Sequence, residues 1–278
     1  MTATGESSST SQIIPPALGN SNSSVLSPLL QPSPSLDRFC RWISSLQGTD
    51  QLMMLVQYTL DIVTHHMDTR GMTRLLSVIA KYLPLLSSNP SIVVVKGSPS
   101  PLSTRLKLLA QKLADGRIFL RLHGIIPTYE WLLTTHASPP TDPTLAKVAK
   151  LQTYANIIYF PLENAAYLGS HSILPMSKRT ETDLWIWSCR FWAAHVALEF
   201  VRLYRERQIR IKGKGKEKAG DDSNEKRKWW ASLIMNLAYA PLTVHWSLEH
   251  GLGFRDVEIG YFGVIAAIAS IYLGYPRS

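Results

Sequence analysis

The stretch IGYFGVIAAIASIYLGY, residues 259–275, contains no charged side chain and decides the class of fold. As a helix rising about 1.5 Å per residue it is about 26 Å long, slightly shorter than a hydrocarbon core of about 30 Å. With Val257 and Glu258 at its edge, it can cross a thin organelle membrane. The alternative is a buried helix of a soluble bundle. Its aromatic residues lie near the two ends, as in the aromatic belts of membrane helices: Tyr261, Phe262, Tyr272 and Tyr275.

Small residues recur on one side of this stretch. Gly263 and Ala267 are four residues apart, as are Ser270 and Gly274. Side chains this small let helix backbones approach closely in lipid, where van der Waals packing contributes to association. The pattern predicts a close helix contact, either within a hairpin or between protomers, and makes these four residues candidates for oligomerisation.

A second apolar segment precedes the first. Residues 229–245 contain no Asp, Glu, Lys or Arg, and Pro241 predicts a kink of the kind that membrane helices tolerate. The short segment 249–256 is sufficient for a turn between the two. We therefore expect residues 229–278 to form a membrane-anchoring helical hairpin.

The residues before this hairpin are rich in bases. The positive-inside rule places them, and with them both ends of the hairpin, in the cytosol. They also attract anionic headgroups. Nucleic acid is not an expected partner, because interleaved aromatics and a recognisable nucleic-acid fold are missing. We expect residues 211–228 to be a basic hydrophilic loop. The bases are Arg202, Arg205, Arg207, Arg210, Lys212, Lys214, Lys216, Lys218, Lys226, Arg227 and Lys228.

Composition and periodicity predict an all-α protein. Of the 278 residues, 45% are hydrophobic and 18% charged, below the about 25% of soluble domains, and the net charge of +9 favours anionic surfaces. The run 92–95 has no second β-like segment with which to pair. We interpret residues 36–210 as a helical region, which the resemblance described below implies to be a membrane-remodelling region. Apolar residues recur with helical spacing from Leu36, with a new helix start at Thr49-Asp50 and further helices at about 72–86, 103–122, 126–136, 143–169 and 183–210.

The first 35 residues differ from the rest. Residues 1–35 are rich in serine and proline and contain no Lys or Arg. Such a segment buries too little apolar surface to offset its ordering entropy, so we expect a disordered tail. It lacks the features of a secretory signal or a mitochondrial presequence.

Only two cysteines occur, Cys40 and Cys189, which excludes a disulfide scaffold and favours a reducing, intracellular setting.

Residues 103–122 predict a basic amphipathic helix. Leucines at helical spacing line one side and bases flank them, the pattern of a helix that lies in a membrane interface. Asp115-Gly116 interrupts the middle, and further apolar residues widen the apolar side, so an ordinary packed helix is the alternative. The candidate lipid-binding residues are Arg105, Leu106, Leu109, Lys112, Leu113, Arg117, Leu120 and Arg121.

We expect no catalytic, metal or cofactor site. His195 and Glu199 share one side of a helix, but a single His–Glu pair is not a metal site, and the H-E-x-x-H order is absent. The sequence contains no Gly-rich phosphate loop, C-x-x-C pair or G-x-S-x-G elbow. A non-enzymatic protein is therefore expected, and a lipid-modifying enzyme is disfavoured.

Several short motifs occur in an order that resembles the peroxin-11 family of peroxisomal membrane proteins, in its divergent fungal branch. The resemblance extends over nearly the whole chain except the tail. The motifs are Leu36-Asp37-Arg38-Phe39, Gly48-Thr49-Asp50, Gln57-Tyr58, RIFLRLHGIIPTYEW at 117–131, Leu151-Gln152, Leu162-Glu163-Asn164, Tyr167-Leu168 and GYFGVIAAIASIYLGY at 260–275.

The resemblance implies a protein of the peroxisomal membrane that elongates and tubulates this membrane before fission. It implies three kinds of partner: an anionic phospholipid membrane, a second copy or a family relative, and dynamin-type fission machinery. The family's leaflet-inserting helix maps onto 103–122. The chain departs from the family pattern in its leader, in its 89–102 loop and in Asp115-Gly116. A pore or transporter for small metabolites is the alternative function, and it would need more spans than the two that the sequence offers.

Overall fold

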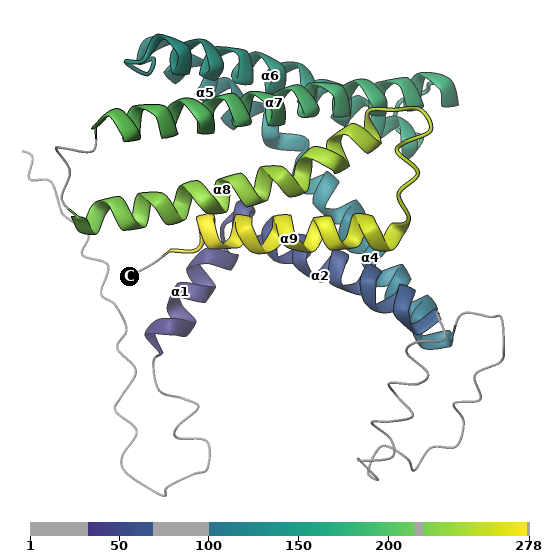
Figure 1. Ribbon diagram of the computed structural model, residues 1–278. Helices are drawn as coiled ribbons and strands as arrows, with labels where there is room; N and C mark the ends of the chain where they lie inside the picture. The colour runs from purple at the N-terminus through teal and green to yellow at the C-terminus, as the bar shows by residue number, and fades with distance from the viewer. Residues whose placement is uncertain (1–32, 69–99, 214–218, 277–278) are drawn as a thin grey trace, which may run out of the picture. The chain divides into compact units, whose positions relative to one another are not determined.

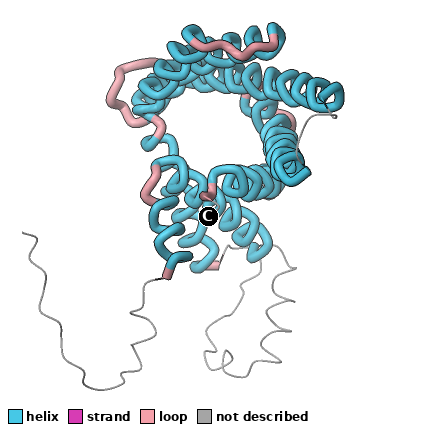
Figure 2. The backbone as a smooth tube through the Cα atoms, turned by 90° about the vertical axis from the view of Figure 1, so that its left-hand side faces the viewer, coloured by secondary structure: helices cyan, strands magenta, loops and turns pink. Residues whose placement is uncertain are grey.

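The computed structural model describes residues 33–68, 100–213 and 219–276. The chain divides into two compact units, residues 1–39 and 40–278. Every regular element in the described ranges is a helix (Figure 2), which confirms the all-α prediction. The elements, labelled in Figure 1, are α1 (Pro34–Ile43), α2 (Leu46–Asp68), α4 (Pro101–Leu120), the 3-10 turn η2 (Leu122–Gly124), α5 (Ile125–Ala137), α6 (Pro143–Ser170), α7 (Lys178–Gly213), α8 (Ala219–Trp246) and α9 (Asp256–Gly274).

Three of the described helices, α1, α4 and α6, begin at a polar residue followed by proline. The Ser100 hydroxyl accepts a hydrogen bond from the backbone N–H of Ser103, and Pro101 opens α4. Asp142 accepts from two backbone N–H groups at the start of α6, which opens with Pro143. These caps satisfy donors that a helix start leaves unpaired, and proline is favoured in the first turn because it has no N–H to leave unpaired.

The break between α1 and α2 lies earlier than predicted. Thr49-Asp50 was expected to start a helix after Gly48, but α2 already begins at Leu46. The hydroxyls of Ser44 and Ser45 donate to carbonyls of the preceding turn and so end α1 at that point. Gly48 lies inside α2, where a Cβ atom would come 2.0 Å from the Trp42 carbonyl oxygen.

The predicted basic loop at 211–228 is wrong for most of its length. Helix α7 continues to Gly213, and α8 begins at Ala219. Long basic and acidic side chains are good helix formers, so a hydrophilic run next to an apolar segment can continue the helix instead of ending it. Residues 214–218 lie outside the described residues. So do the predicted helix at 72–86, the run 92–95 and most of the tail.

In the second unit, neighbouring helices pack on one another in a closed ring of contacts. Helix α2 contacts α4 and α9, α8 contacts α9 and α7, and α6 contacts α7 and α5. Figure 1 shows α8 and α9 running side by side as the predicted hairpin, with α2 also against α9. The last helix is thus packed on the second one, more than 180 residues earlier in the sequence.

Helix α9 is long and apolar enough to cross a membrane, and no other described helix meets that criterion. The sequence predicted two such arms, but α8 carries a strongly charged first part and a less apolar second part. About a third of the apolar window of α9 is buried inside the structure. On its outward side are four exposed apolar residues: Tyr261, Ile265, Ile268 and Tyr272.

The small residues of α9 face α2. A Cβ atom on Gly263 would lie 2.3 Å from the ring of Tyr58, and one on Gly274 would lie 2.9 Å from the side-chain amide of Gln51. The same amide donates a hydrogen bond to the Ser270 carbonyl at 3.0 Å. The predicted close contact therefore exists within one chain, to α2, a partner that the sequence reading had not considered.

We expect Gly263→Leu to lower the free energy of unfolding by about 1–3 kcal/mol, because the new side chain overlaps the Tyr58 ring. Thermal unfolding of the full-length protein in detergent micelles measures the change. Ile268→Leu, on the exposed side of α9, is the matched control and should leave the midpoint unchanged. Adding Tyr58→Ala should recover part of the loss in Gly263→Leu. Equal stability of Gly263→Leu and the unaltered protein would show that α9 does not pack on α2.

Candidate functional site

A cavity of about 640 Å³ lies among α2, α4, α6, α7 and α8. We call it the central cavity. Its walls combine aromatic rings with charged and amide side chains, an unusual mixture for a protein interior. The main lining residues are Asp50, Gln57, Tyr58, Ala114, Arg117, Arg121, Asn156, Tyr159, Glu163, Trp185, Cys189, Trp192, His195, Tyr239 and Trp246.

Arg117 connects α4 to α2. Its Nε donates to Asp50 Oδ1 at 2.9 Å, and a terminal guanidinium nitrogen donates to Gln57 Oε1 at 2.8 Å. The guanidinium also lies over the Tyr58 ring, 5.8 Å from its centre. Arg117 is buried, so these contacts replace the water that its charge has lost.

Arg121 connects the same helix to α6. It lies 3.0 Å from Glu163 Oε1, and the Glu163 side chain is only 6% exposed. One residue further, Asn164 Nδ2 donates to the Leu122 carbonyl at 2.9 Å. Burial raises the pKa of Tyr159 well above its usual value, so this neighbouring hydroxyl keeps its proton. The end of α4 is thereby fixed on α6.

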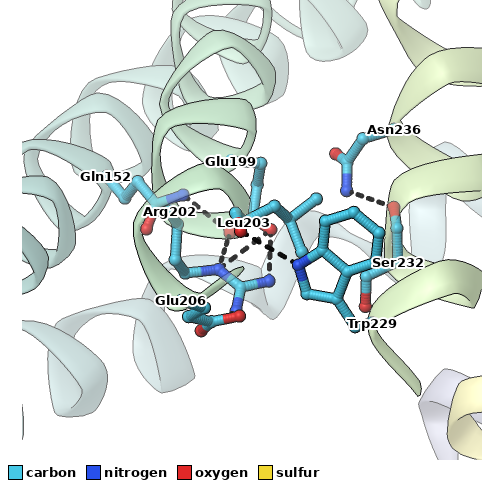
Figure 3. A network of polar contacts seen from close by, with 8 residues as sticks. All are labelled: Gln152, Glu199, Arg202, Leu203, Glu206, Trp229, Ser232 and Asn236. Carbon is cyan, nitrogen blue, oxygen red and sulfur yellow. Dashed lines mark hydrogen bonds and ion pairs between the residues drawn. The ribbon is translucent and has the colours of Figure 1, made fainter. Parts of the chain in front are cut away.

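A second polar network joins α6 to α7 (Figure 3). Gln152 Nε2 donates to Glu199 Oε1 at 2.7 Å, and Arg202 bridges Glu199 and Glu206. Next to it, the Asn156 amide lies 2.8 Å from His195 Nδ1. Burial lowers the pKa of His195, which keeps its ring neutral at neutral pH. His195 and Glu199 therefore take part in helix packing.

The predicted lipid-binding residues separate into two groups. Arg117 and Arg121 line the central cavity, which corrects their assignment to a lipid-facing side: their carboxylate partners come from α2 and α6, distant in sequence. Leu106, Leu113 and Leu120 are half-buried. The residues of the prediction that remain on the surface are Arg105, Leu109 and Lys112.

A different exposed surface occurs on α4, which we call the outer face of α4. Its apolar residues are between 48% and 60% exposed. Asp115-Gly116, which interrupted the sequence pattern, has a structural use, because Asp115 Oδ1 accepts a hydrogen bond from Tyr167 on α6 at 3.2 Å. The outer face consists of Leu102, Arg105, Leu108, Leu109, Lys112 and Phe119.

Sequence reasoning missed the acceptors of the central cavity, Asp50, Gln57 and Glu163. Asp50 was expected only as part of a helix start, and Gln57 and Glu163 only as parts of family motifs. These motifs place polar residues within apolar helices. Because buried polar groups need hydrogen-bond partners, this pattern could have indicated an internal polar site. In the described ranges, no cluster of three or more His, Cys, Asp or Glu could hold a metal ion.

Comparison with known proteins gives two matches. The family model described as Peroxisomal biogenesis factor 11 (PEX11) matches residues 91–273. An uncharacterized protein of Schizosaccharomyces pombe is 30% identical over 196 residues, which are 67% of this chain and 89% of that protein. No solved structure matches.

The family match covers α4 to α9 almost completely and leaves α2 outside it. Proteins of this family are peroxisome biogenesis factors of the peroxisomal membrane and are not an enzyme family. The apolar helix α9 is compatible with that location. This chain belongs to the Peroxisomal biogenesis factor 11 (PEX11) family and is a peroxisomal membrane protein that acts in peroxisome proliferation.

Proposed function

We propose that this protein elongates the peroxisomal membrane by inserting the outer face of α4 into one leaflet. The observation that carries the proposal is the composition of this face, in which exposed leucines and Phe119 lie beside Arg105 and Lys112. Apolar side chains of an interfacial helix enter about 5–10 Å into the headgroup and acyl boundary. Inserted area expands that leaflet relative to the other, and the membrane curves.

A contact between α4 and α9 supports a place at the membrane surface. Lys107 Nζ lies 3.7 Å from a carboxylate oxygen of Asp256, the first residue of α9. If α9 crosses the membrane, this pair lies where the chain enters it. The nearby Arg105 and Lys112 are then within reach of lipid phosphates, and each base near an anionic surface adds about 1 kcal/mol of attraction.

Other partners follow from the same proposal. An elongated membrane is the form on which dynamin-type fission machinery acts. Association with a second copy or a family relative remains a prediction, and the small residues of α9 are an unsuitable surface for it because they are packed on α2.

Changing Leu108 and Leu109 together to Asp should abolish elongation and leave the protein in the peroxisomal membrane, because the acids prevent insertion while α9 still anchors the chain. The measurement is the length and number of peroxisomes in cells that express each variant. The matched control is Ile126→Asp with Leu133→Asp, which changes two exposed apolar residues of α5. An equal loss of elongation in the control would contradict a specific role of α4.

The proposal also requires one orientation of the hairpin. The start of α4 lies beside the α8–α9 turn, whereas the basic run lies at the other end of α8. Outward elongation needs an expanded cytosolic leaflet, so this turn must face the cytosol. The positive-inside rule favours the opposite orientation.

We therefore expect a cysteine introduced as Glu249→Cys in this turn, combined with Cys40→Ser, to react with a membrane-impermeant maleimide added to intact peroxisomes. Cys189 gives a low background, because burial raises the pKa of its thiol to about 11 and the thiolate is the reactive form. Labelling is read by the mass shift on a gel. Reaction only after the membrane is permeabilised would show that α4 lies at the lumenal leaflet, and elongation by this face would be wrong.

A second candidate function is a passage for small polar metabolites, and the central cavity favours it. Concave sites that combine apolar and aromatic walls with a few convergent polar groups are the usual binding sites of small molecules. The cavity of about 640 Å³ has room for a small metabolite and is lined by Asp50, Arg117, Arg121 and Glu163.

If the central cavity conducts, Ala114→Phe should lower the release of a small anionic dye from proteoliposomes several-fold, because the ring fills space beside Arg117. Ala137→Phe, at an exposed position of α5, is the control and should release dye at the original rate. Elongation of peroxisomes should persist in both variants. Release no faster than from protein-free liposomes would exclude the passage.

A further inference from the structure

We propose that a second cavity, between the end of α7 and the start of α8, binds the phosphate of an anionic phospholipid headgroup. This cavity, which we call the α7–α8 cleft, has a volume of about 400 Å³. It is separate from the central cavity and from the outer face of α4, so the inference does not depend on elongation. Residues that define it are Arg202, Leu203, Arg210, Lys228, Trp229 and Ser232.

A hydrogen bond between the two helices helps to fix the walls of the cleft. The Trp229 indole Nε1 donates to the Leu203 carbonyl at 2.9 Å, as Figure 3 shows. Leu203 itself is only 2% exposed. The Asn236 amide donates to the Ser232 carbonyl one turn earlier on α8. A ligand therefore meets a preformed recess, and little ordering of side chains opposes its binding.

The charges in the cleft leave cationic donors available. Arg202 is paired with both Glu199 and Glu206, so the Glu206 carboxylate that also lines the cleft already has a cationic partner. The second acid of the cleft, Glu225, pairs with Lys228 only at 3.5 Å, and both side chains are 53% exposed. An exposed ion pair of this kind contributes little to stability, so a phosphate can displace the Glu225 carboxylate from Lys228.

Two further cations, Arg210 and Arg207, lie at the cleft. Arg210 has no ion pair among the described side chains and lines the cleft. Arg207 lies over the Trp229 ring, 5.6 Å from its centre, and holds a positive charge just behind the wall. Arginine forms two parallel hydrogen bonds to phosphate, so Arg210 and Lys228 together can hold one phosphate group from two helices.

The surface next to the cleft indicates a lipid as the source of this phosphate. Trp230, the residue after Trp229, is 55% exposed, as is typical of tryptophan at membrane–water interfaces. Helix α8 packs antiparallel on the candidate span α9, so its start lies near a membrane surface. A phosphate bound in the cleft would therefore lie at the depth of the lipid headgroups.

The test uses full-length protein in uncharged detergent micelles and three probes: dioctanoyl phosphatidylinositol 4-phosphate, dioctanoyl phosphatidylcholine and water-soluble inositol 1,4-bisphosphate. Native mass spectrometry counts bound molecules and gives affinities. We expect saturable binding of one phosphoinositide per chain, with binding about tenfold weaker after Arg210→Gln with Lys228→Gln, a loss equivalent to about 1.4 kcal/mol. The matched control removes the same charge from the exposed start of α7 with Lys178→Gln and Arg179→Gln, and it should bind as the unaltered protein does.

A second variant keeps the charge and removes the space. Ser232→Phe fills the cleft, and it should abolish binding while the unfolding midpoint stays unchanged. Equal binding of inositol 1,4-bisphosphate would support the phosphate site and assign its source to a soluble compound. Binding that does not saturate would overturn the proposal, as would an equal reduction of binding by the cleft variants and by the Lys178→Gln, Arg179→Gln control.

Discussion

Two ion pairs, each between one buried and one half-buried side chain, hold helix α4 in position, and the arrangement of the second unit depends on them. Arg117 and Arg121 are one turn apart on α4 and reach different neighbours, Asp50 on α2 and Glu163 on α6. A buried guanidinium without its acid is strongly destabilising, so α4 is stable here only with both neighbours present. All four charged side chains also line the central cavity.

The two ion pairs decide which side of α4 is buried and which is exposed. Because both arginines point inward, the side that remains outside carries Leu108, Leu109 and Lys112. At the far end of the hairpin, the cleft between α7 and α8 presents a second group of cations. Cationic surfaces thus occur near both ends of α9, as expected of a protein that contacts the headgroups of two leaflets.

Much of this fold could be predicted from sequence, because helix periodicity, proline after a capping residue and an uncharged final segment are local signals. The side of α4 that remains exposed could not, because apolar residues surround the helix and the partners of its arginines lie 67 and 42 residues away. The packing of α9 on α2 could be predicted only in part. Gly263 and Gly274 indicate a close approach, but only the structure identifies Tyr58 and Gln51 of α2 as the partners. The length of the loop after α7 was overestimated, because charge was taken as a signal for a loop.

The packing of α9 on α2 has a consequence for synthesis. The Gln51 side chain bonds to the backbone of Ser270, 219 residues later in the chain. At about 5–20 residues per second, a ribosome needs about 10 to 40 s to produce that partner after α2 has emerged. During this interval α2 exposes Tyr58 and an unpaired amide to its surroundings. The second unit therefore cannot complete its fold until α9 has been synthesised, and α2 has to wait for this partner.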